Sequence, residues 1–435
     1  MAELLNRPTP RLEPEQLRAY VQRFLDRRQA FLNFERAHGA PLYAFDRAAL
    51  IARGRKFMAV FRRRFPDIQP CYAIKSNNFP EVARILVGEG YGLDASSGDE
   101  LIMALEVGAK TIVFSGPGKT DEELELAVKN SGRVILMLDS AAELDRLEKI
   151  ASRQNQIMKC GVRLTTVESG IWRKFGTPLE ALPDIFRQAE GCRFVKLAGF
   201  HFHISWNLDP DNQVKFIARL GGALRTLAST HRAGLEFLDI GGGFWPPEGE
   251  WMQSAATPEG MLLNALSEAT GEPLEHFCKA AFPLTVFAEQ IERALAETIP
   301  SDVRFKLYCE PGRWLCHESM HILLKVIDRK AADLVITDGG INAVGWERYE
   351  SDYFPVINLT RPSLEERECL VAGSLCTPHD IWGYSYFGED IQPGDILLIP
   401  DQGAYTYSLR QHFIKPLPQV IAMDDAPQNS GGDTV

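Results

Sequence analysis

Two strand-and-helix repeats follow each other in the stretch CYAIKSNNFPEVARILVGEGYGLDASSGDELIMALEV, residues 71–107. The runs at 71–74 and 91–94 are short and apolar, as in buried strands, whereas 80–89 and 99–107 have helical spacing and helix start signals. Parallel strands need a crossover of a dozen or more residues, usually a helix. The alternation therefore predicts parallel strands separated by helices.

The same alternation continues along the chain. Further β-rich runs lie at 111–114, 134–138, 160–164, 197–203, 237–240 and 305–308. With the first two runs they make about eight strands, the number that closes a β/α barrel, and an open doubly wound sheet is the alternative. Beyond about residue 315, short strands separated by turns predict an antiparallel β domain.

We therefore predict an α/β fold, with a (β/α)8 barrel of the TIM type over residues 41–315 and an antiparallel β domain over 316–423. An N-terminal helix within 1–40 is expected to pack with the β domain. The polar, glycine-rich tail 424–435 is expected to be disordered. The interval 244–303 is long for one crossover, and we interpret it as an insertion after the seventh strand.

The composition excludes several classes of protein. Of 435 residues, 45% are hydrophobic and 24% charged, which is typical of a globular protein. The net charge of −11 disfavours binding to nucleic acid. No run approaches the roughly 18 apolar residues of a membrane span, and the first residues do not resemble a signal peptide. We expect a cytoplasmic protein with neither nucleic acid nor membrane as partner.

Polar side chains and glycines stand directly after the predicted strands. In a β/α barrel these positions share one rim, where active sites are built. The residues are Lys75, Asp94, Ser115 to Gly118, Asp139, Arg163, His203, Gly241 to Gly243 and Glu310. Their shared position predicts an active site at this rim.

Three of these positions suggest particular chemistry. Lys75 ends a buried strand, where desolvation frees an amine to bond to a carbonyl carbon, although a solvated strand end is the alternative. The glycines 241–243 either offer backbone N–H groups to an anion or form a tight turn. Glu310 and Arg313 can hold a proton on a ring nitrogen and clamp a phosphate, or can form a structural ion pair.

Two histidines, His201 and His203, lie on one face of a predicted strand. They can form a metal site with nearby carboxylates, or one of them can stack on an aromatic cofactor. Because Phe200 and Phe202 alternate with them, we favour stacking and predict no metal site. In the β domain, Cys376 and Tyr405 are candidates for an acid or nucleophile and for a phosphate donor, with turn residues around a buried thiol as the alternative.

Together these motifs resemble the ornithine/diaminopimelate/arginine decarboxylase family, pyridoxal-phosphate enzymes with the alanine-racemase-like fold. The motifs, in order over about residues 40–420, are Tyr72-Ala-Ile-Lys75-Ser-Asn, Phe114-Ser-Gly-Pro-Gly-Lys-Thr, Asp239-Ile-Gly-Gly-Gly, Cys309-Glu-Pro-Gly-Arg313, Leu375-Cys376 and Gly403-Ala-Tyr405. The resemblance implies a carboxy-lyase that takes a small amino acid. It also implies a head-to-tail homodimer whose active sites combine both subunits.

The resemblance also implies a role for each matching residue. Lys75 would bond covalently to pyridoxal 5'-phosphate beside Asp94, and Glu310 would pair with the ring nitrogen. Cys376 of the partner subunit would return a proton to the carbon that loses carbon dioxide, a general-acid step. The other implied cofactor contacts are Arg163, His203, Gly241, Gly242, Gly243, Gly312, Arg313 and Tyr405. Glu310 favours decarboxylation, because racemases of this fold place an arginine at that nitrogen.

Two departures from the family pattern concern the phosphate and the substrate. The usual His-x-Gly-Ser is His203-Ile-Ser-Trp206 here, so Ser205 is expected to replace the phosphate serine. Family members for ornithine or diaminopimelate carry Asp or Glu after the cysteine, to bind the distal ammonium, whereas this chain has Thr377. Leu-Cys-Thr-Pro-x-Asp resembles the branch that decarboxylates citryl-diaminopropionate or carrier-bound glutamyl groups in siderophore and antibiotic pathways. We expect a substrate with an uncharged or acylated far end.

Three alternatives stay open. Diaminopimelate is the alternative substrate, because Glu350 and Asp352 can supply an ammonium site. An amino-acid racemase of the same fold is the second alternative. A non-catalytic pyridoxal-phosphate-binding homologue is the third, and it would be expected to lack one of the residues Lys75, Glu310, Cys376 and Tyr405, all of which are present.

Overall fold

The structure is a computed structural model that describes residues 9–266, 274–345 and 351–423. The chain divides into two compact units. One unit, here called the barrel unit, comprises Leu50–Pro247 and Ala281–Cys316. The other, here called the β unit, comprises Met1–Ala49, Glu248–Ala280 and His317–Val435.

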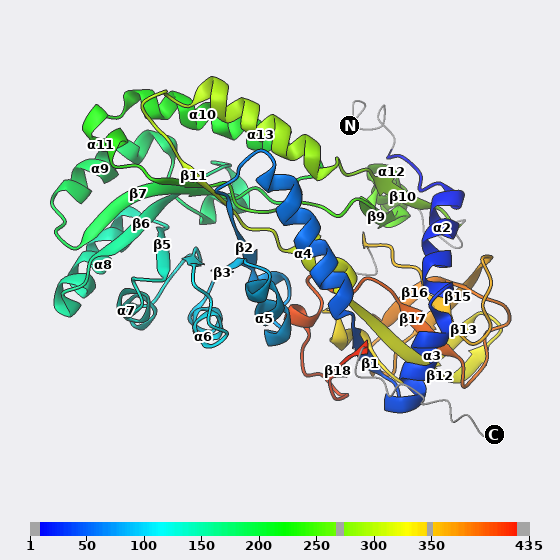
Figure 1. Cartoon of the computed structure of the whole chain (residues 1–435). Helices are drawn as coiled ribbons and strands as arrows, with labels where there is room; N and C mark the ends of the chain where they lie inside the picture. The colour runs from blue at the N-terminus through cyan, green and yellow to red at the C-terminus, as the bar shows by residue number, and fades with distance from the viewer. Residues whose placement is uncertain (1–8, 267–273, 346–350, 424–435) are drawn as a thin grey trace, which may run out of the picture. The chain divides into compact units, whose positions relative to one another are not determined.

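The barrel unit contains a closed barrel of eight parallel strands, which confirms the predicted α/β barrel (Figure 1). Every neighbouring pair is parallel, including β11 with β2, which closes the ring. The strands are β2 (Gln69–Ala73), β3 (Gly92–Ala95), β4 (Ile112–Phe114), β5 (Val134–Leu138), β6 (Met158–Leu164), β7 (Val195–Phe202), β8 (Phe237–Asp239) and β11 (Lys306–Cys309).

Helices surround the barrel strands in Figure 1. They are α4 (Arg47–Arg62), α5 (Pro80–Gly88), α6 (Gly98–Glu106), α7 (Asp121–Lys129), α8 (Ala141–Gln154), α9 (Leu182–Glu190), α10 (Asp211–Thr226), α11 (Ser229–Ala233) and α13 (Leu284–Thr298). Side chains that accept a backbone N–H begin several of them: Ser97 caps α6, Thr120 caps α7 and Ser140 caps α8. Such caps satisfy amides that have no partner within the helix, so strand, turn and helix are encoded locally.

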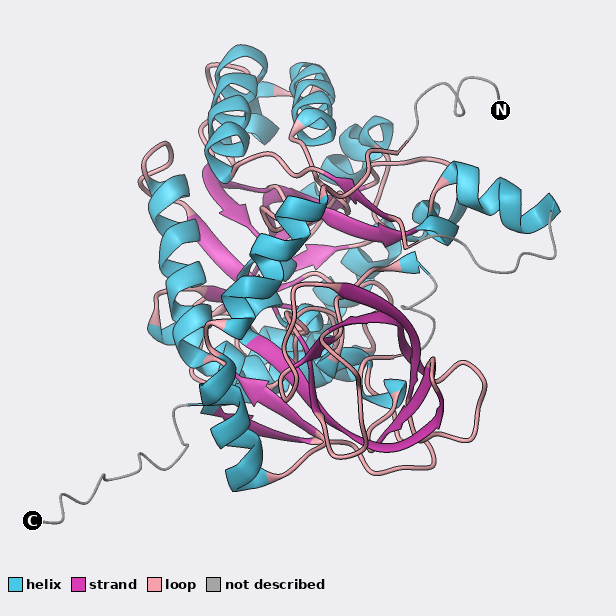
Figure 2. Cartoon of the chain, turned by 90° about the vertical axis from the view of Figure 1, so that its right-hand side faces the viewer, coloured by secondary structure: helices cyan, strands magenta, loops and turns pink. Residues whose placement is uncertain are grey.

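The β unit is built on an eight-stranded sheet in the order β13-β15-β16-β14-β17-β12-β1-β18. Pairing of β13 with β12 closes six of these strands into a ring, and Figure 2 shows the strands curling round. Most pairings are antiparallel, as expected. The strands are β1 (Leu42–Phe45), β12 (Met320–Ala331), β13 (Leu334–Thr337), β14 (Ile357–Asn358), β15 (Glu366–Ala372), β16 (Ile381–Phe387), β17 (Ile396–Ile399) and β18 (Gln419–Ala422).

The N-terminal helices share the core of the β unit. Phe24 of α2 (Pro14–Leu25) and Phe31 of α3 (Arg28–His38) lie in one buried cluster with Leu323 and Leu398. The apolar face of each helix is covered in this way, as its spacing predicts.

The structure places two segments differently from the sequence-based boundaries. Strand β1 lies within the residues predicted for the barrel, but it pairs with β12 and β18 in the β unit. Residues 248–280 of the expected insertion also belong to the β unit, and α13 then leads back to β11. They form β9 (Glu250–Gln253), α12 (Pro258–Leu266) and β10 (His276–Lys279). The tail 424–435 lies outside the described residues.

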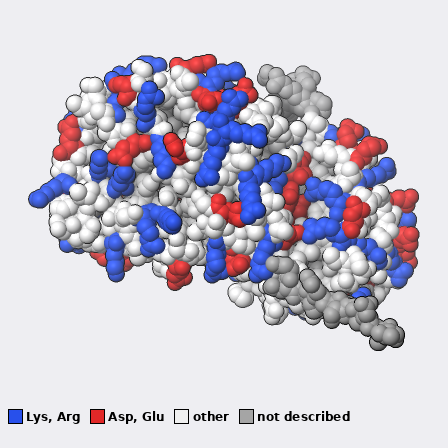
Figure 3. All heavy atoms as spheres, in the orientation of Figure 1, with Lys and Arg blue, Asp and Glu red and all other residues white. Residues whose placement is uncertain are grey.

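Two surface properties bear on partners. Within the described ranges, no helix combines the length and apolar character that a bilayer crossing needs. Figure 3 shows both basic and acidic side chains on the drawn face, with Lys and Arg gathered most densely over its middle.

Candidate active site

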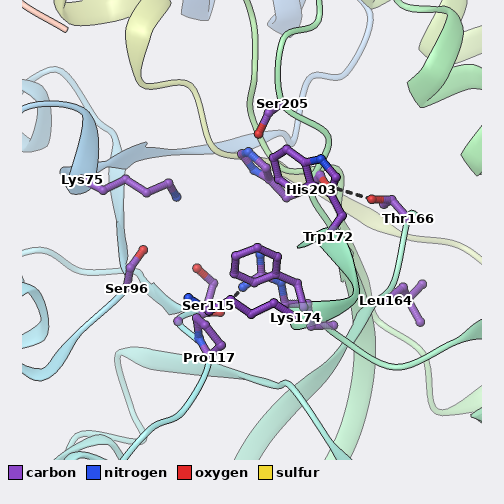
Figure 4. A pocket seen from close by; sticks show the side chains of 13 residues that line it. Lys75, Ser96, Ser115, Pro117, Leu164, Thr166, Trp172, Lys174, His203 and Ser205 are labelled. Carbon is purple, nitrogen blue, oxygen red and sulfur yellow. Dashed lines mark hydrogen bonds between the residues drawn. The ribbon is translucent and has the colours of Figure 1, made fainter. Parts of the chain in front are cut away.

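A pocket of about 260 Å³ opens among the loops that follow the barrel strands (Figure 4). Seven residues predicted from the sequence line it, namely Lys75, Ser115, Gly116, Pro117, Arg163, His203 and Ser205. They lie at or just after the ends of β2, β4, β6 and β7, so the pocket lies at the carboxyl ends of the strands, as β/α barrels place their sites.

Lys75 is held by a buried carboxylate. Its Nζ lies 2.8 Å from Oδ2 of Asp94, which is inaccessible to solvent. The Ser115 hydroxyl donates to the other oxygen of Asp94 at 2.5 Å. Close by, burial raises the pKa of Glu100 to about 7, and the charge of Asp94 adds to the shift. The amine of Lys75 thus lines the pocket and is positioned by the buried carboxylate of Asp94.

Glu310, at the end of β11, lies between two histidines. Its oxygens are 3.2 Å from Nε2 of His201 and 3.4 Å from Nδ1 of His203. Burial works against ionisation of Glu310, but His201, His203 and Lys75 outweigh it and hold the pKa of Glu310 well below its usual range. Burial lowers the pKa of His203.

Neither histidine contact with Glu310 has the angles of a hydrogen bond. Within the described part of the chain, both carboxylate oxygens of Glu310 are buried and accept no hydrogen bond. A buried, ionised carboxylate without a donor is costly. The site therefore fits a ligand that brings a positively charged N–H, such as a protonated pyridine ring.

The three side chains also place ligand atoms within 4.8 Å of one another, as a metal site would. However, Nδ1 of His203 accepts the N–H of Gly242 at 3.2 Å, so its lone pair is already used. This contact disfavours a metal at the nitrogen that faces Glu310, and the absence of a metal site remains a prediction.

The glycines after β8 form a tight turn at a close approach of backbones. Gly241 and Gly243 have φ of +65° and +80°, and a Cβ on Gly242 would lie 2.1 Å from the carbonyl oxygen of Glu310. The N–H of Gly241 donates to the buried Asp239 and that of Gly242 to His203. Two of the three amides expected for an anion are therefore engaged within the protein.

Both predicted arginines of the barrel unit are packed against aromatic rings. Arg163 donates to the Ser115 carbonyl at 2.8 Å and lies 4.6 Å from the Phe175 ring centroid. Arg313 lies 4.3 Å from the ring centroid of Trp245. The preceding Gly312 leaves no room for a side chain, since a Cβ there would come within 2.8 Å of the Ser76 hydroxyl.

The remaining predicted residues belong to the β unit. Cys376 is exposed, Thr377 follows it, and Tyr405 sits in a turn with φ of +55°. Asp352 makes an isolated β-bridge with Met252, and Glu350 lies outside the described residues. Thus the barrel unit unites the lysine, the histidines and Glu310, whereas the expected proton donor and phosphate tyrosine are carried by the other unit.

The sequence analysis missed an aromatic and basic side of the pocket. Trp172, Lys174 and Phe175 line it from the loop between β6 and α9. The length of this connection could have indicated a binding loop. Between the end of β6 and the start of α9 it contains only the short helices η2 (Gly170–Lys174) and η3 (Leu179–Ala181). Long loops at the carboxyl ends of barrel strands commonly form binding sites.

Known proteins share this fold over most of the chain. The chain is 28% identical to L-glutamyl-[BtrI acyl-carrier protein] decarboxylase of Niallia circulans, over 86% of each chain. It is also 28% identical to diaminopimelate decarboxylase of Methanothermobacter thermautotrophicus, over 88% of this chain and 86% of that one. Identity to 2-[(L-alanin-3-ylcarbamoyl)methyl]-2-hydroxybutanedioate decarboxylase of Staphylococcus aureus is 25%, over 83% of this chain and 90% of that one.

Among solved structures, diaminopimelate decarboxylase of Helicobacter pylori complexed with L-lysine matches with a TM-score of 0.74. Its identity is 24%, over 90% of this chain and 93% of that one, so this likeness concerns the fold. Residues 52–317 match the family model described as pyridoxal-dependent decarboxylase, pyridoxal binding domain. The matched segment contains the lysine and Glu310 of the pocket and covers more than half of the chain. The chain therefore belongs to the pyridoxal-dependent decarboxylases, carboxy-lyases that require pyridoxal 5'-phosphate.

Proposed function

We propose that this decarboxylase removes the α-carboxylate of an amino acid whose far end is uncharged or acylated. The observation that carries the proposal is that Asp380, the first acidic residue after Cys376, is already bound to the backbone of the protein. Asp380 is 2% exposed, and its two oxygens accept the backbone N–H groups of Leu375 at 2.6 Å and Ile341 at 2.8 Å. With Thr377 in place of an acid, this turn offers no carboxylate to a substrate ammonium.

The residues of the barrel unit divide the work on the cofactor. Bound pyridoxal phosphate supplies the electron sink for the bonding pair that carbon dioxide leaves behind. Lys75 would hold it, with Asp94 Oδ2 2.8 Å from Lys75 Nζ to position the amine. Glu310 would hold a proton at the ring nitrogen, His203 would stack on the ring, and Arg163 would lie near the ring oxygen.

The remaining contacts complete this proposal. The phosphate would be bound by Ser205, Gly312, Arg313 and Tyr405, together with backbone N–H groups of the 241–243 turn. Cys376 gives the proton from its Sγ to the α-carbon of the product, a general-acid step worth about 10²–10⁴-fold in rate.

We further propose a homodimer in which one protomer supplies Lys75 and its partner supplies Cys376. The test mixes two inactive variants, Lys75→Ala and Cys376→Ala, after dissociation. If half of the re-formed dimers are mixed and each mixed dimer has one intact site, activity returns to about a quarter of the wild-type value. If mixed dimers form but the mixture stays inactive, the proposal of a shared site is contradicted.

Diaminopimelate is the second candidate substrate, because relatives of that name are as similar to this chain as the carrier-protein enzyme is. Asp352, two residues after Glu350 in the sequence, favours it as a source of negative charge. The two substrates differ at the far end, which is charged in diaminopimelate and acylated in the alternative.

The deciding experiment measures carbon dioxide release from diaminopimelate, ornithine, lysine and citryl-diaminopropionate. Turnover of the acylated compound with at least tenfold greater kcat/KM supports the proposal, and preference for a free diamine contradicts it. In parallel, purified protein is expected to be yellow, and Lys75→Ala is expected to abolish the colour. Product analysis by chiral chromatography separates decarboxylation from racemisation, because a racemase keeps the carboxylate.

A further inference from the structure

The loop after β6 leaves the barrel through a fixed neck. Thr165 N–H donates to the Thr177 carbonyl at 2.9 Å, and Thr177 N–H donates to the Arg163 carbonyl at 2.8 Å. The Gly176 N–H donates to Asp139 at 3.0 Å. Gly176 has φ of +73°, and a Cβ there would lie 2.7 Å from the backbone of Leu164. Both ends of residues 166–175 are therefore anchored to the barrel.

This loop supplies one side of the pocket. Trp172, Lys174 and Phe175 line the cavity, and the Phe175 ring lies near two cations, with the Arg163 guanidinium 4.6 Å and Lys174 Nζ 5.4 Å from its centroid. In Figure 4, Lys174 lies at the opposite end of the pocket from Ser205. If Ser205 marks the phosphate end, as proposed above, the Lys174 end is left for the substrate.

The charges of the pocket are unbalanced at that end. Lys75 lies 2.8 Å from Asp94, and Arg163 Nε lies 3.9 Å from Asp139. Lys174, by contrast, has no carboxylate within 4 Å among the described residues, and none of the residues that line the pocket is acidic. A cation beside flat apolar rings suits an acyl group that ends in a carboxylate.

We propose that Lys174 selects substrates whose far end carries a carboxylate. This inference rests on the proposed function, because it assigns a contact to the far end of the same substrate. It narrows the substrate class from any acylated amino acid to one acylated by a diacid or a polyacid. Lys174 is a specificity residue, because it contacts the far end and takes no part in the bond that breaks.

The test uses three probes that share 2,3-diaminopropionate and differ at the β-nitrogen. The N-succinyl probe ends in a carboxylate, the N-butyryl probe is neutral with the same chain length, and the free amine is a cation. The wild-type enzyme is expected to prefer succinyl over butyryl by about tenfold in kcat/KM, as for one charge-assisted contact. Lys174→Ala is expected to remove that preference through KM, and Lys174→Glu to favour the free amine.

Arg173→Glu is the matched control, because Arg173 is likewise exposed, directly precedes Lys174 in the chain and does not line the pocket. It is expected to keep the wild-type preference. Binding of the succinyl product, N-succinyl-ethylenediamine, is measured by calorimetry as a readout without turnover, and Lys174→Ala is expected to weaken it about tenfold. Uptake of pyridoxal phosphate, followed by absorbance, is expected to be unchanged in Lys174→Ala.

The outcomes separate the two proposals. If the enzyme decarboxylates the acylated probes without a charge preference, or if Arg173→Glu changes the preference as Lys174→Glu does, the Lys174 proposal fails and the proposed function stands. If Lys174→Ala takes up pyridoxal phosphate more weakly than wild type and, at saturating cofactor, keeps the wild-type substrate preference, the lysine serves the phosphate and the proposal fails. If only the free amine or diaminopimelate is turned over, both fail.

Discussion

The substitution Asp401→Asn is expected to remove a pH-dependent part of the stability of the β unit. Asp401 is 4% exposed and accepts the Tyr20 hydroxyl at 2.6 Å, while its own N–H donates to Nδ1 of His321 at 3.0 Å. Burial raises the pKa of Asp401 to about 7, against the opposing hydrogen bond from Tyr20. Burial also lowers the pKa of His321 to about 3, so that this ring is neutral when Asp401 titrates.

The sign and size of the pH effect on stability follow from the difference between the pKa of Asp401 in the folded state and its pKa in the unfolded state. The folded carboxyl group has the higher pKa, so the folded state binds the proton more tightly. Its contribution to stability is complete below the unfolded pKa of 3.8 and is lost as the pH rises through about 7. Across the whole range the loss is about 4 kcal/mol, of which about 2.5 kcal/mol falls between pH 5 and pH 8.

The assay is urea unfolding at pH 5, 6, 7 and 8, with wild type, Asp401→Asn and Asp328→Asn. Asparagine does not titrate, so Asp401→Asn is not expected to lose the stability that wild type loses between pH 5 and pH 8. The unfolding free energy of the variant, relative to that of wild type, is therefore expected to rise by about 2.5 kcal/mol over this range. Asp328 is an exposed aspartate of the same unit, and its substitution is expected to give a curve parallel to wild type. A difference for Asp401→Asn that stays constant within about 0.5 kcal/mol would refute the reasoning.

Three further substitutions probe other parts of the molecule. Gly242→Ala is expected to abolish cofactor uptake, measured by absorbance, because its Cβ would lie 2.1 Å from a backbone oxygen; normal uptake contradicts this. Lys119→Met leaves the buried carboxylate of Glu143, now 3.1 Å from Nζ, without its cation and should cost about 3–5 kcal/mol in urea unfolding, whereas Lys119→Met with Glu143→Leu should recover most of it. Asp380→Asn should speed hydrogen exchange of the Leu375 amide by tenfold or more, since a hydrogen bond to a charged group contributes about 1.5–3 kcal/mol.

The barrel was predictable because its signal is local. Most repeats carry their own apolar strand and their own helix, and α6, α7 and α8 also begin at a capping side chain, so the count of eight needs no knowledge of distant contacts. Strand β1 shows the limit of such reasoning. Its four residues are all buried, and its partners β12 and β18 lie hundreds of residues away. A short buried strand has the same pattern in either sheet, so the sequence alone could not place it.

The site was predictable to the extent that it depends on strand ends. Lys75, Asp94 and Glu310 lie at or just after the carboxyl ends of three different strands, and closure of the barrel brings strand ends to one rim. The loop 166–175 was not predictable in the same way, because the inward orientation of Lys174 depends on how the loop folds after its neck. Its anchors are backbone hydrogen bonds, which leave no mark in composition or periodicity.

Acidic residues at the rim divide between two uses, and the loop that follows decides which applies. Asp94 lies 2.8 Å from the amine of Lys75, whereas Asp139 and Asp239 each accept the N–H of a glycine with positive φ, Gly176 and Gly241. A carboxylate bound to a turn in this way shapes the loop and is withdrawn from chemistry. An acidic residue at a strand end is therefore a candidate for catalysis only when no glycine with positive φ donates its N–H to that carboxylate. Sequence position alone cannot show such a hydrogen bond when the glycine lies more than thirty residues away, as Gly176 does from Asp139.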